Sequence, residues 1–308
     1  MHKRLLDCSA SELNALDKNE LLYAIKASEG RVLVSENIVI TSPLLTQVTN
    51  AELAASQGAD LLLLNMFDAE NPVINGMPEN IAPTDLITEL KRLTGRVIGV
   101  NLEAVDPEFA QQHDEIWQMS SGRVANAENA QKLYDMGVRF IVITGNPNNG
   151  VSNRAISHAL QQIHSVVGDK LVIITGKMHG AGVVSESGAK IITGEDVSRF
   201  AKNGADIILV PAPGTVPGMS QDYVSELINV AHQHKVMAMT AIGTSQEGAD
   251  VSTIRQIALM SKMAGADLHH IGDTGYMGMA LPENIQAYSV VIRGIRHTYT
   301  RIARSINR

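Results

Sequence analysis

The sequence predicts an α/β protein, a (β/α)8 TIM barrel with an N-terminal helical extension. Short apolar segments of strand length alternate with longer segments of helical character, and successive strand starts lie roughly 28 to 42 residues apart, the length of one strand-helix unit. The apolar strands lack an alternating polar face, which is typical of parallel strands buried on both sides. We expect eight strands, near residues 31–35, 59–65, 96–102, 138–144, 170–176, 205–211, 236–242 and 266–271.

A repeated tripeptide marks the start of several of these units. Gly-Ala-Asp occurs at residues 58–60, 204–206 and 265–267, each time directly before an apolar run. Glycine at the end of a helix tolerates the left-handed conformation that turns the chain into the next strand. Eight such units favour a closed barrel. An open doubly wound sheet is the alternative, but no Gly-x-Gly-x-x-Gly turn follows the first strand.

The segment before the first strand is predicted to be helical. Ser9 with Glu12 and Asp17 with Glu20 have the spacing of capping boxes, and Gly30 is placed to end the segment. We therefore divide the chain into a helical extension, residues 1–30, and a barrel, residues 31–308. A last helix from Pro282 onward should close the ring.

Composition restricts the class of protein. The 308 residues carry a formal charge of -7, which argues against a general nucleic-acid binder, and no apolar run approaches the roughly 20 residues that a membrane span needs. The single cysteine, Cys8, excludes an intrachain disulfide, and no secretory signal is visible. We expect a cytoplasmic homo-oligomer with no nucleic-acid or membrane partner. The arginines of the last helix are expected to face solvent or a neighbouring subunit: Arg293, Arg296, Arg301, Arg304 and Arg308.

Polar residues follow the predicted strands, where a barrel places its active site. Because the strands themselves are almost wholly apolar, these groups together indicate a polar pocket. Asparagines at three strand ends are candidates for substrate binding: Asn65, Asn101 and Asn146.

The seventh and eighth strand ends have the residue types of a phosphate site. Glycines allow a ligand to approach the backbone, hydroxyl groups donate hydrogen bonds, and amides at the start of a short helix favour an anion. Asp273 lies in the same segment, and a carboxylate repels phosphate unless it turns away or binds a metal. The candidate substrate-binding residues are Gly243, Thr244, Ser245, Gly272, Thr274 and Gly275.

Other strand-end residues are candidates for catalysis. Lys177 is suited to clamp an anionic group, or to form a Schiff base with a carbonyl compound. General acids and bases, or a site for a divalent metal such as Mg²⁺, could come from carboxylates and histidines. His269 and His270 cannot both face one pocket, because adjacent strand residues point to opposite sides. The catalytic candidates are Glu36, Glu103, Lys177, His179, His270 and Asp273.

The Gly-Ala-Asp strand starts and the glycines after strands seven and eight resemble the superfamily of phosphate-binding (β/α)8 barrels, which includes isomerases, aldolases and lyases. The start at 4–8, the His-His-Ile-Gly-Asp segment at 269–273 and the segments 282–285 and 293–299 look like a bacterial family often labelled phosphoenolpyruvate phosphonomutase-like or haloacid-dehalogenase-like. The resemblance implies a barrel fold. It brings no catalytic residues, because the family has no settled ones. Neither label's own motif is complete either, since a second acid is missing after Asp7 and a cysteine is missing from the segment 177–180.

These observations lead to one expected function and two alternatives. We expect a lyase or isomerase that acts on a small phosphorylated metabolite with a carbonyl group, a sugar phosphate or keto-acid phosphate, at the mouth of the barrel. The alternatives are a non-catalytic sensor of a phosphorylated metabolite and a metal-dependent phosphohydrolase.

Overall fold

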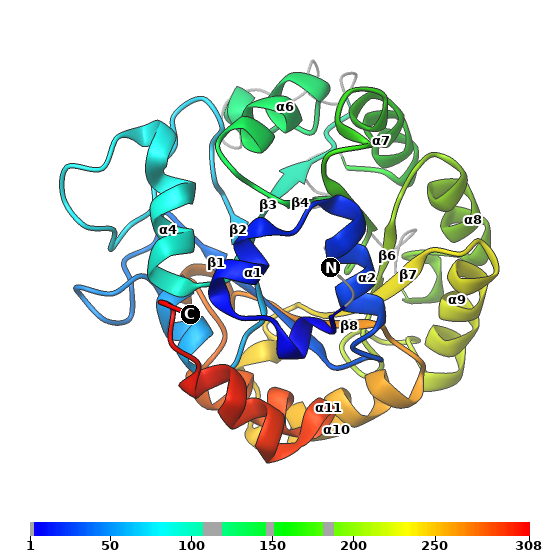
Figure 1. Cartoon of the computed structure of the whole chain (residues 1–308). Coiled ribbons are helices and arrows are strands. Elements are labelled where there is room, and N and C mark those ends of the chain that lie inside the picture. The colour runs from blue at the N-terminus through cyan, green and yellow to red at the C-terminus, as the bar shows by residue number, and fades with distance from the viewer. Residues whose placement is uncertain (1–2, 107–118, 146–150, 181–187) are drawn as a thin grey trace.

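In the computed structural model, eight parallel strands form a closed barrel surrounded by helices (Figure 1). The structure describes residues 3–106, 119–145, 151–180 and 188–308. Each strand pairs with its neighbours in the sequence, and β1 pairs with β8 to close the ring. The predicted barrel is confirmed, and the open sheet is excluded. The strands are β1 (Val32–Ile38), β2 (Leu61–Asn65), β3 (Val97–Glu103), β4 (Phe140–Thr144), β5 (Val172–Gly176), β6 (Ile207–Pro211), β7 (Met237–Ile242) and β8 (Leu268–Ile271).

Helices cover the outside of the barrel, and their ends follow the sequence signals. Thr49 and Thr193 both form capping boxes, and Gly95 ends its helix in the left-handed conformation with φ of 61°. Within the described ranges, none of the helices combines the length and apolar character that a bilayer crossing requires. The outer helices are α3 (Asn50–Ser56), α4 (Leu86–Thr94), α6 (Ala127–Asp135), α7 (Asn153–Val167), α8 (Gly194–Lys202), α9 (Gln221–Gln233), α10 (Val251–Met263) and α11 (Pro282–Ala303).

Side chains of the strands alternate between two buried clusters. One cluster lies between strands and helices and includes Leu62 and Ile141, and the other fills the barrel and includes Leu61 and Phe140. The ring of Phe140 occupies the space in which a side chain at Gly99 on the neighbouring strand would lie. The barrel interior is therefore filled by side chains, and a ligand-binding site must lie above it, at the ends of the strands.

The N-terminal extension covers the other end of the barrel. It consists of η1 (Leu5–Asp7), α1 (Ala10–Ala15) and α2 (Lys18–Lys26), and both predicted capping boxes form. Figure 1 shows this blue segment across the middle of the ring. Its apolar side chains belong to the same buried cluster as the barrel interior. The extension thus completes the barrel core and closes the end that faces away from the strand-end residues.

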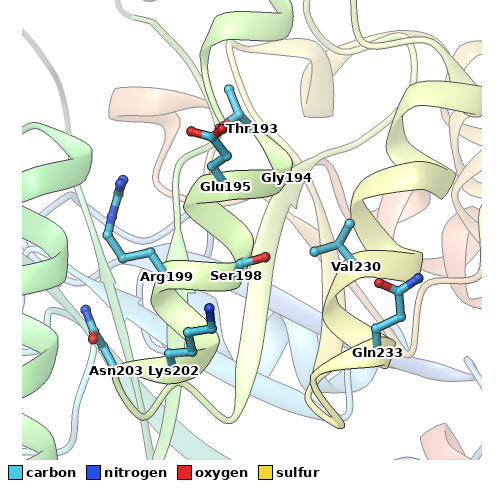
Figure 2. A pocket seen from close by; sticks show the side chains of 9 residues that line it. All are labelled: Thr193, Gly194, Glu195, Ser198, Arg199, Lys202, Asn203, Val230 and Gln233. Carbon is cyan, nitrogen blue, oxygen red and sulfur yellow. The ribbon is translucent and has the colours of Figure 1, made fainter.

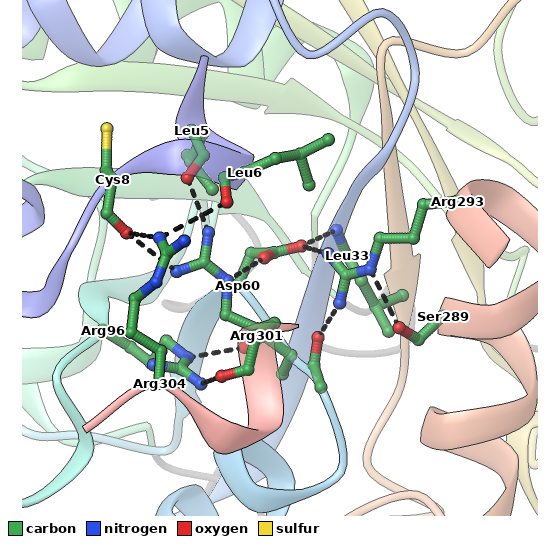
Figure 3. A network of polar contacts seen from close by, with 12 residues as sticks. Leu5, Leu6, Cys8, Leu33, Asp60, Arg96, Ser289, Arg293, Arg301 and Arg304 are labelled. Atoms are coloured by element: carbon green, nitrogen blue, oxygen red, sulfur yellow. Dashed lines mark hydrogen bonds and ion pairs between the residues drawn. The ribbon is translucent and has the colours of Figure 1, made fainter. Parts of the chain in front are cut away.

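A buried ion network joins the last helix to the start of β2 and to the extension (Figure 3). Asp60, fully buried, binds both Arg293 and Arg301, with 2.8 Å between its Oδ1 and Nε of Arg301. Arg301 also donates through Nη2 to the carbonyl of Leu5, and Arg304 donates to the carbonyl of Cys8.

The expectation that the arginines of the last helix face solvent or a subunit is therefore wrong for two of them. Arg293 and Arg301 are 6% and 2% exposed, because Asp60 provides a buried partner that a helix pattern alone cannot reveal. Arg296 and Arg308 are exposed, as expected. Helix α11 also changes direction at Gly294, where φ is 75° and ψ is 166°.

Candidate active site

A polar cavity of about 250 Å³ lies at the carboxyl ends of the strands. Most of the residues that reach it occupy the inward positions of the strands or follow directly after them, as expected for a barrel, whereas Arg123 and Glu247 come from the longer loops. Most of the sequence-predicted candidates meet here. The cavity is lined by Glu36, Asn65, Met66, Asn101, Glu103, Arg123, Thr144, Gly145, Met178, His179, Gly243, Thr244, Glu247, Gly272 and Asp273.

Several predicted site residues lie elsewhere. His270 is buried below the cavity, and Lys177, Ser245, Thr274 and Gly275 are not among the lining residues. Asn146 falls outside the described residues.

Glu36 and His270 form a buried pair inside the barrel. Glu36 Oε2 lies 2.9 Å from His270 Nε2, and their side chains are 5% and 0% exposed. Glu36 lines the cavity while His270 lies beneath it, so the ring orients the carboxylate. His269 occupies the opposite face of β8, where its Nε2 lies 3.0 Å from the carbonyl of Gly30 and its Nδ1 lies 3.2 Å from the hydroxyl of Tyr288.

Asp273 faces the same cavity in a different environment. Its Oδ2 accepts a hydrogen bond from Asn65 Nδ2 at 2.9 Å, and its Oδ1 accepts from the amide of Gly275 at 2.8 Å. Burial, and then the charge of Glu36, raise the pKa of Asp273 to about 7. A carboxylate with this pKa can give up and regain a proton near neutral pH.

Glu103 is paired with a residue that the sequence analysis did not single out. Arg123, from η3 (Ser121–Arg123), donates through Nη2 to Glu103 Oε1 at 2.5 Å. Arg123 lies in an irregular segment of the chain that has no hydrophobic periodicity. The sequence therefore gives no pattern from which its position at the cavity could be predicted. Arg123 places a guanidinium group at the wall of an otherwise acidic cavity.

His179 and Lys177 follow the end of β5, but only His179 lines the cavity. Burial lowers the pKa of His179, so its ring is neutral at pH 7 and can accept a proton or donate a hydrogen bond. Lys177 is 1% exposed, and burial lowers its pKa to about 8.

Two of the three hydroxyl groups proposed for phosphate binding, those of Thr244 and Thr274, donate to the backbone. Thr244 Oγ1 lies 2.6 Å from the carbonyl of Gly243, and Thr274 Oγ1 lies 2.7 Å from the carbonyl of Asp273. Carboxylates also accept from the nearby amides, since Thr274 N donates to Glu247 Oε1 and Gly275 N donates to Asp273. The seventh and eighth loops therefore use these donors internally.

The loops at this end also contain unusual backbone conformations. Met66, Thr244, Ser245 and Thr274 have φ values of 61°, 60°, 64° and 53°, a region that non-glycine residues rarely adopt. Such residues concentrate at sites where the fold must place groups for function. All four follow the ends of β2, β7 or β8, next to the cavity.

Glu247 is another lining residue that was not among the predicted site residues, as are Met66, Thr144, Gly145 and Met178. It lies in η7 (Gln246–Gly248), is 3% exposed, and is fixed by the amide of Thr274, 2.8 Å from Oε1. The only sequence signal is its place four residues after Gly243, in the seventh strand-end loop. With Glu36, Glu103 and Asp273, it makes the cavity strongly acidic.

The predicted divalent metal has no preformed site in the described part of the chain. No group of three or more His, Cys, Asp or Glu side chains there has an arrangement that could hold a metal ion.

Two other hollows lie away from the strand ends. A broad groove of about 1000 Å³ runs between α8 and α9, lined by residues such as Glu195, Arg199, Lys202 and Gln233 (Figure 2). Another, of about 450 Å³, lies beside α2 near His232 and Asp267. The groove in Figure 2 lies on the helical exterior, whereas barrels place their chemistry at the carboxyl ends of the strands. The smaller polar cavity is therefore the better candidate.

Solved structures share this barrel. An archaeal fructose 1,6-bisphosphate aldolase matches with a TM-score of 0.57 and 13% identity, over 90% of this chain and 99% of that chain. The carboxyl transferase domain of Rhizobium etli pyruvate carboxylase, with pyruvate, matches with a TM-score of 0.53 and 11% identity, over 96% of this chain and 53% of that chain. A provisionally assigned lyase/mutase from Burkholderia cenocepacia J2315 matches with a TM-score of 0.50 and 14% identity, over 84% and 81%.

At these identities the likeness shows the fold alone, and that fold is the predicted (β/α)8 barrel. No curated protein matches the sequence. A family model described as "Domain of unknown function (DUF7916)" matches residues 6–308, so the chain belongs to the DUF7916 family.

Proposed function

We propose that the protein is an enzyme that transfers protons on a small carbonyl compound, with a lyase or isomerase outcome. The observation that carries this proposal is the placement of Glu36 and Asp273 in one cavity, where the charge of Glu36 helps to raise the pKa of Asp273 to about 7. Two carboxyl groups with different environments are suited to different roles in acid-base catalysis.

Asp273 would remove a proton from the carbon next to the carbonyl group. The amides of Asn65 and Gly275 hold its two oxygens, so the ionised form is oriented and partly stabilised. The carboxylate of Glu36, fixed by His270, would take a proton from a hydroxyl group of the substrate and so assist isomerisation or the cleavage of the neighbouring bond, while Asp273 returns its proton to the product. The same pair of groups serves a lyase or an isomerase, and the substrate decides which reaction follows.

The negative charge that develops on the carbonyl oxygen needs hydrogen-bond donors. Thr144 is 3% exposed, and its Oγ1 has no hydrogen-bond partner among the described residues. The ring of His179 also lines the cavity and is neutral at pH 7, since burial lowers its pKa. Preorganised donors of this kind stabilise an enolate without reorganising in the transition state.

The cavity restricts the substrate. Its volume of about 250 Å³ lies below the usual range for drug-sized ligands, so we propose a compound of a few carbon atoms, a keto acid or a small sugar phosphate. Arg123 is the guanidinium group available for an anionic end, in competition with Glu103. A phosphate at the eighth loop would have to displace the carboxylates that accept from Thr274 and Gly275.

Incubation of the protein with a panel of small keto acids and sugar phosphates in D₂O tests the proposal. Proton NMR should show deuterium entering the position next to the carbonyl group of at least one compound, and Asp273→Asn should remove that exchange. A panel without exchange in the wild-type protein contradicts the proposed function.

A further inference from the structure

Glu247 is held rigidly at the wall of the cavity by contacts on both sides. Its Oε1 accepts from the amide of Thr274 at 2.8 Å, and its backbone carbonyl accepts from Asn284 Nδ2 at 2.9 Å. Asn284, in α11, is fully buried, and Glu247 is 3% exposed. A Cβ at Gly272 would lie 3.2 Å from Glu247 Cδ, so the carboxyl group packs closely against the end of β8. Its position is therefore determined by the fold.

The two oxygens of this carboxyl group differ. Oε1 has a donor, whereas the buried Oε2 has no hydrogen-bond partner among the described residues. A buried polar atom without a partner costs free energy, and an ionised one costs more. The carboxyl groups of Glu36 and Asp273 increase that cost, while backbone amides and His270 oppose them.

Asp273 and Glu247 are thus suited to opposite protonation states. Both oxygens of Asp273 accept hydrogen bonds from N–H donors, which stabilises its ionised form. In Glu247 only Oε1 accepts such a bond, from the amide of Thr274, and Oε2 has no donor in the described part of the chain. Burial raises the pKa of Glu247, against the effects of its own amide, the Thr274 amide and His270. A proton on Glu247 Oε2 would break no existing hydrogen bond, whereas a proton on either oxygen of Asp273 would displace an N–H donor.

We propose that Glu247 is an uncharged carboxylic acid whose Oε2 hydrogen is donated to the carbonyl oxygen of the substrate, making it a further catalytic residue. This inference rests on the proposed function. No bond is formed or broken by Glu247. Its hydrogen bond to the substrate oxygen strengthens as negative charge develops there, while Asp273 removes the proton from carbon. The donor also selects for ligands that present an oxygen acceptor at this wall.

The protonation state can be measured without a substrate. In protein labelled with ¹³C at the glutamate carboxyl groups, NMR at pH 7 should show one carboxyl resonance at the position of a protonated acid. Glu247→Gln should remove that resonance, and the exposed-site control Glu128→Gln should leave it unchanged. If every glutamate of the wild-type protein is ionised at pH 7, the inference is overturned, whatever the variants do.

Binding tests the donor role, with oxalate as a probe that resembles the enolate of a small keto acid. Glu247→Gln keeps an N–H donor of the same shape, so oxalate affinity should stay within about threefold of wild type. Glu247→Ala should weaken binding roughly tenfold or more. Tighter binding to Glu247→Gln by about tenfold would mean that an ionised Glu247 repels the probe, and equal losses in both variants would also overturn the donor role. If oxalate does not bind the wild-type protein, keto acids are excluded as the substrate class. The NMR experiment then still decides the protonation state of Glu247.

Discussion

The carboxylate of Glu36 is bound to the ring of His270 inside the barrel, with 2.9 Å between Oε2 and Nε2. The pair joins adjacent strands, β1 and β8, at the point where the ring closes. Only Glu36 reaches the cavity, so His270 acts on any substrate through it. Barrel closure therefore sets the orientation of a carboxylate that belongs to the proposed chemistry.

Replacing either member of this pair should separate their roles. Glu36→Gln should lower the proposed proton transfer roughly 100-fold or more, because it removes a proton-transfer group. His270→Gln retains a donor for Glu36 and should lose less activity than His270→Leu, mainly in kcat. The measurement is steady-state kinetics, with Glu195→Gln on the exposed part of α8 as the control. Equal activity in His270→Leu and wild type would show that Glu36 needs no partner.

Asp273 should make stability depend on pH. Its folded-state pKa of about 7 lies above the ordinary value, so the stability it contributes is complete below about pH 4 and is lost as pH rises through 7. Relative to wild type, the unfolding free energy of Asp273→Asn should therefore increase by about 3–4 kcal/mol between pH 4 and pH 8. Urea unfolding at the two pH values measures this difference. If the variant and wild type differ in unfolding free energy by the same amount at pH 4 and pH 8, the raised pKa of Asp273 is contradicted.

The ion network around Asp60 should contribute strongly to stability. Asp60→Asn leaves Arg293 and Arg301 buried without their counter-charge, so unfolding free energy should fall by about 3–5 kcal/mol. Glu89→Gln breaks a pair whose Arg92 side chain is 65% exposed, and this control should cost at most about 0.5 kcal/mol. Chemical denaturation compares the two. Similar losses in both variants would show that the network is not the main connection between α11 and the barrel.

The position of Lys177 bears on the Schiff-base alternative. Its side chain is 1% exposed and outside the cavity lining, although burial lowers its pKa to about 8. We expect no lysine adduct when borohydride is added with carbonyl compounds that undergo exchange, because the amine cannot reach them. Mass spectrometry of the intact protein gives the result. An adduct in wild type that is absent in Lys177→Met would establish the imine mechanism instead.

The barrel could be predicted because its signals are local. Apolar strand runs and glycines with positive φ, such as Gly204 and Gly265, specify each unit independently of the others. Because active sites of barrels lie at the carboxyl ends of the strands, the sequence also predicts that Glu36, Glu103 and Asp273 share one pocket. Strand alternation likewise predicts that His269 and His270 point to opposite sides of the sheet. Which of them points into the barrel can be told only from the register of the closed sheet.

The parts that could not be predicted depend on contacts distant in sequence. Asp60 lies more than 200 residues from Arg293 and Arg301, and only the fold brings them together. Arg123 and Glu247 come from irregular segments without periodicity. Thr244 and Thr274 have the residue type of phosphate ligands, but a sequence does not show that backbone carbonyls already accept their hydroxyl groups.

The pH dependence of deuterium exchange tests the central claim most directly. With a compound that exchanges, the wild-type rate should rise with pH and level off, with a midpoint near the Asp273 pKa of about 7, since the base must be ionised. In Asp273→Asn the rise and most of the exchange should disappear. An unchanged rate and midpoint in that variant would contradict the assignment of Asp273 as the base.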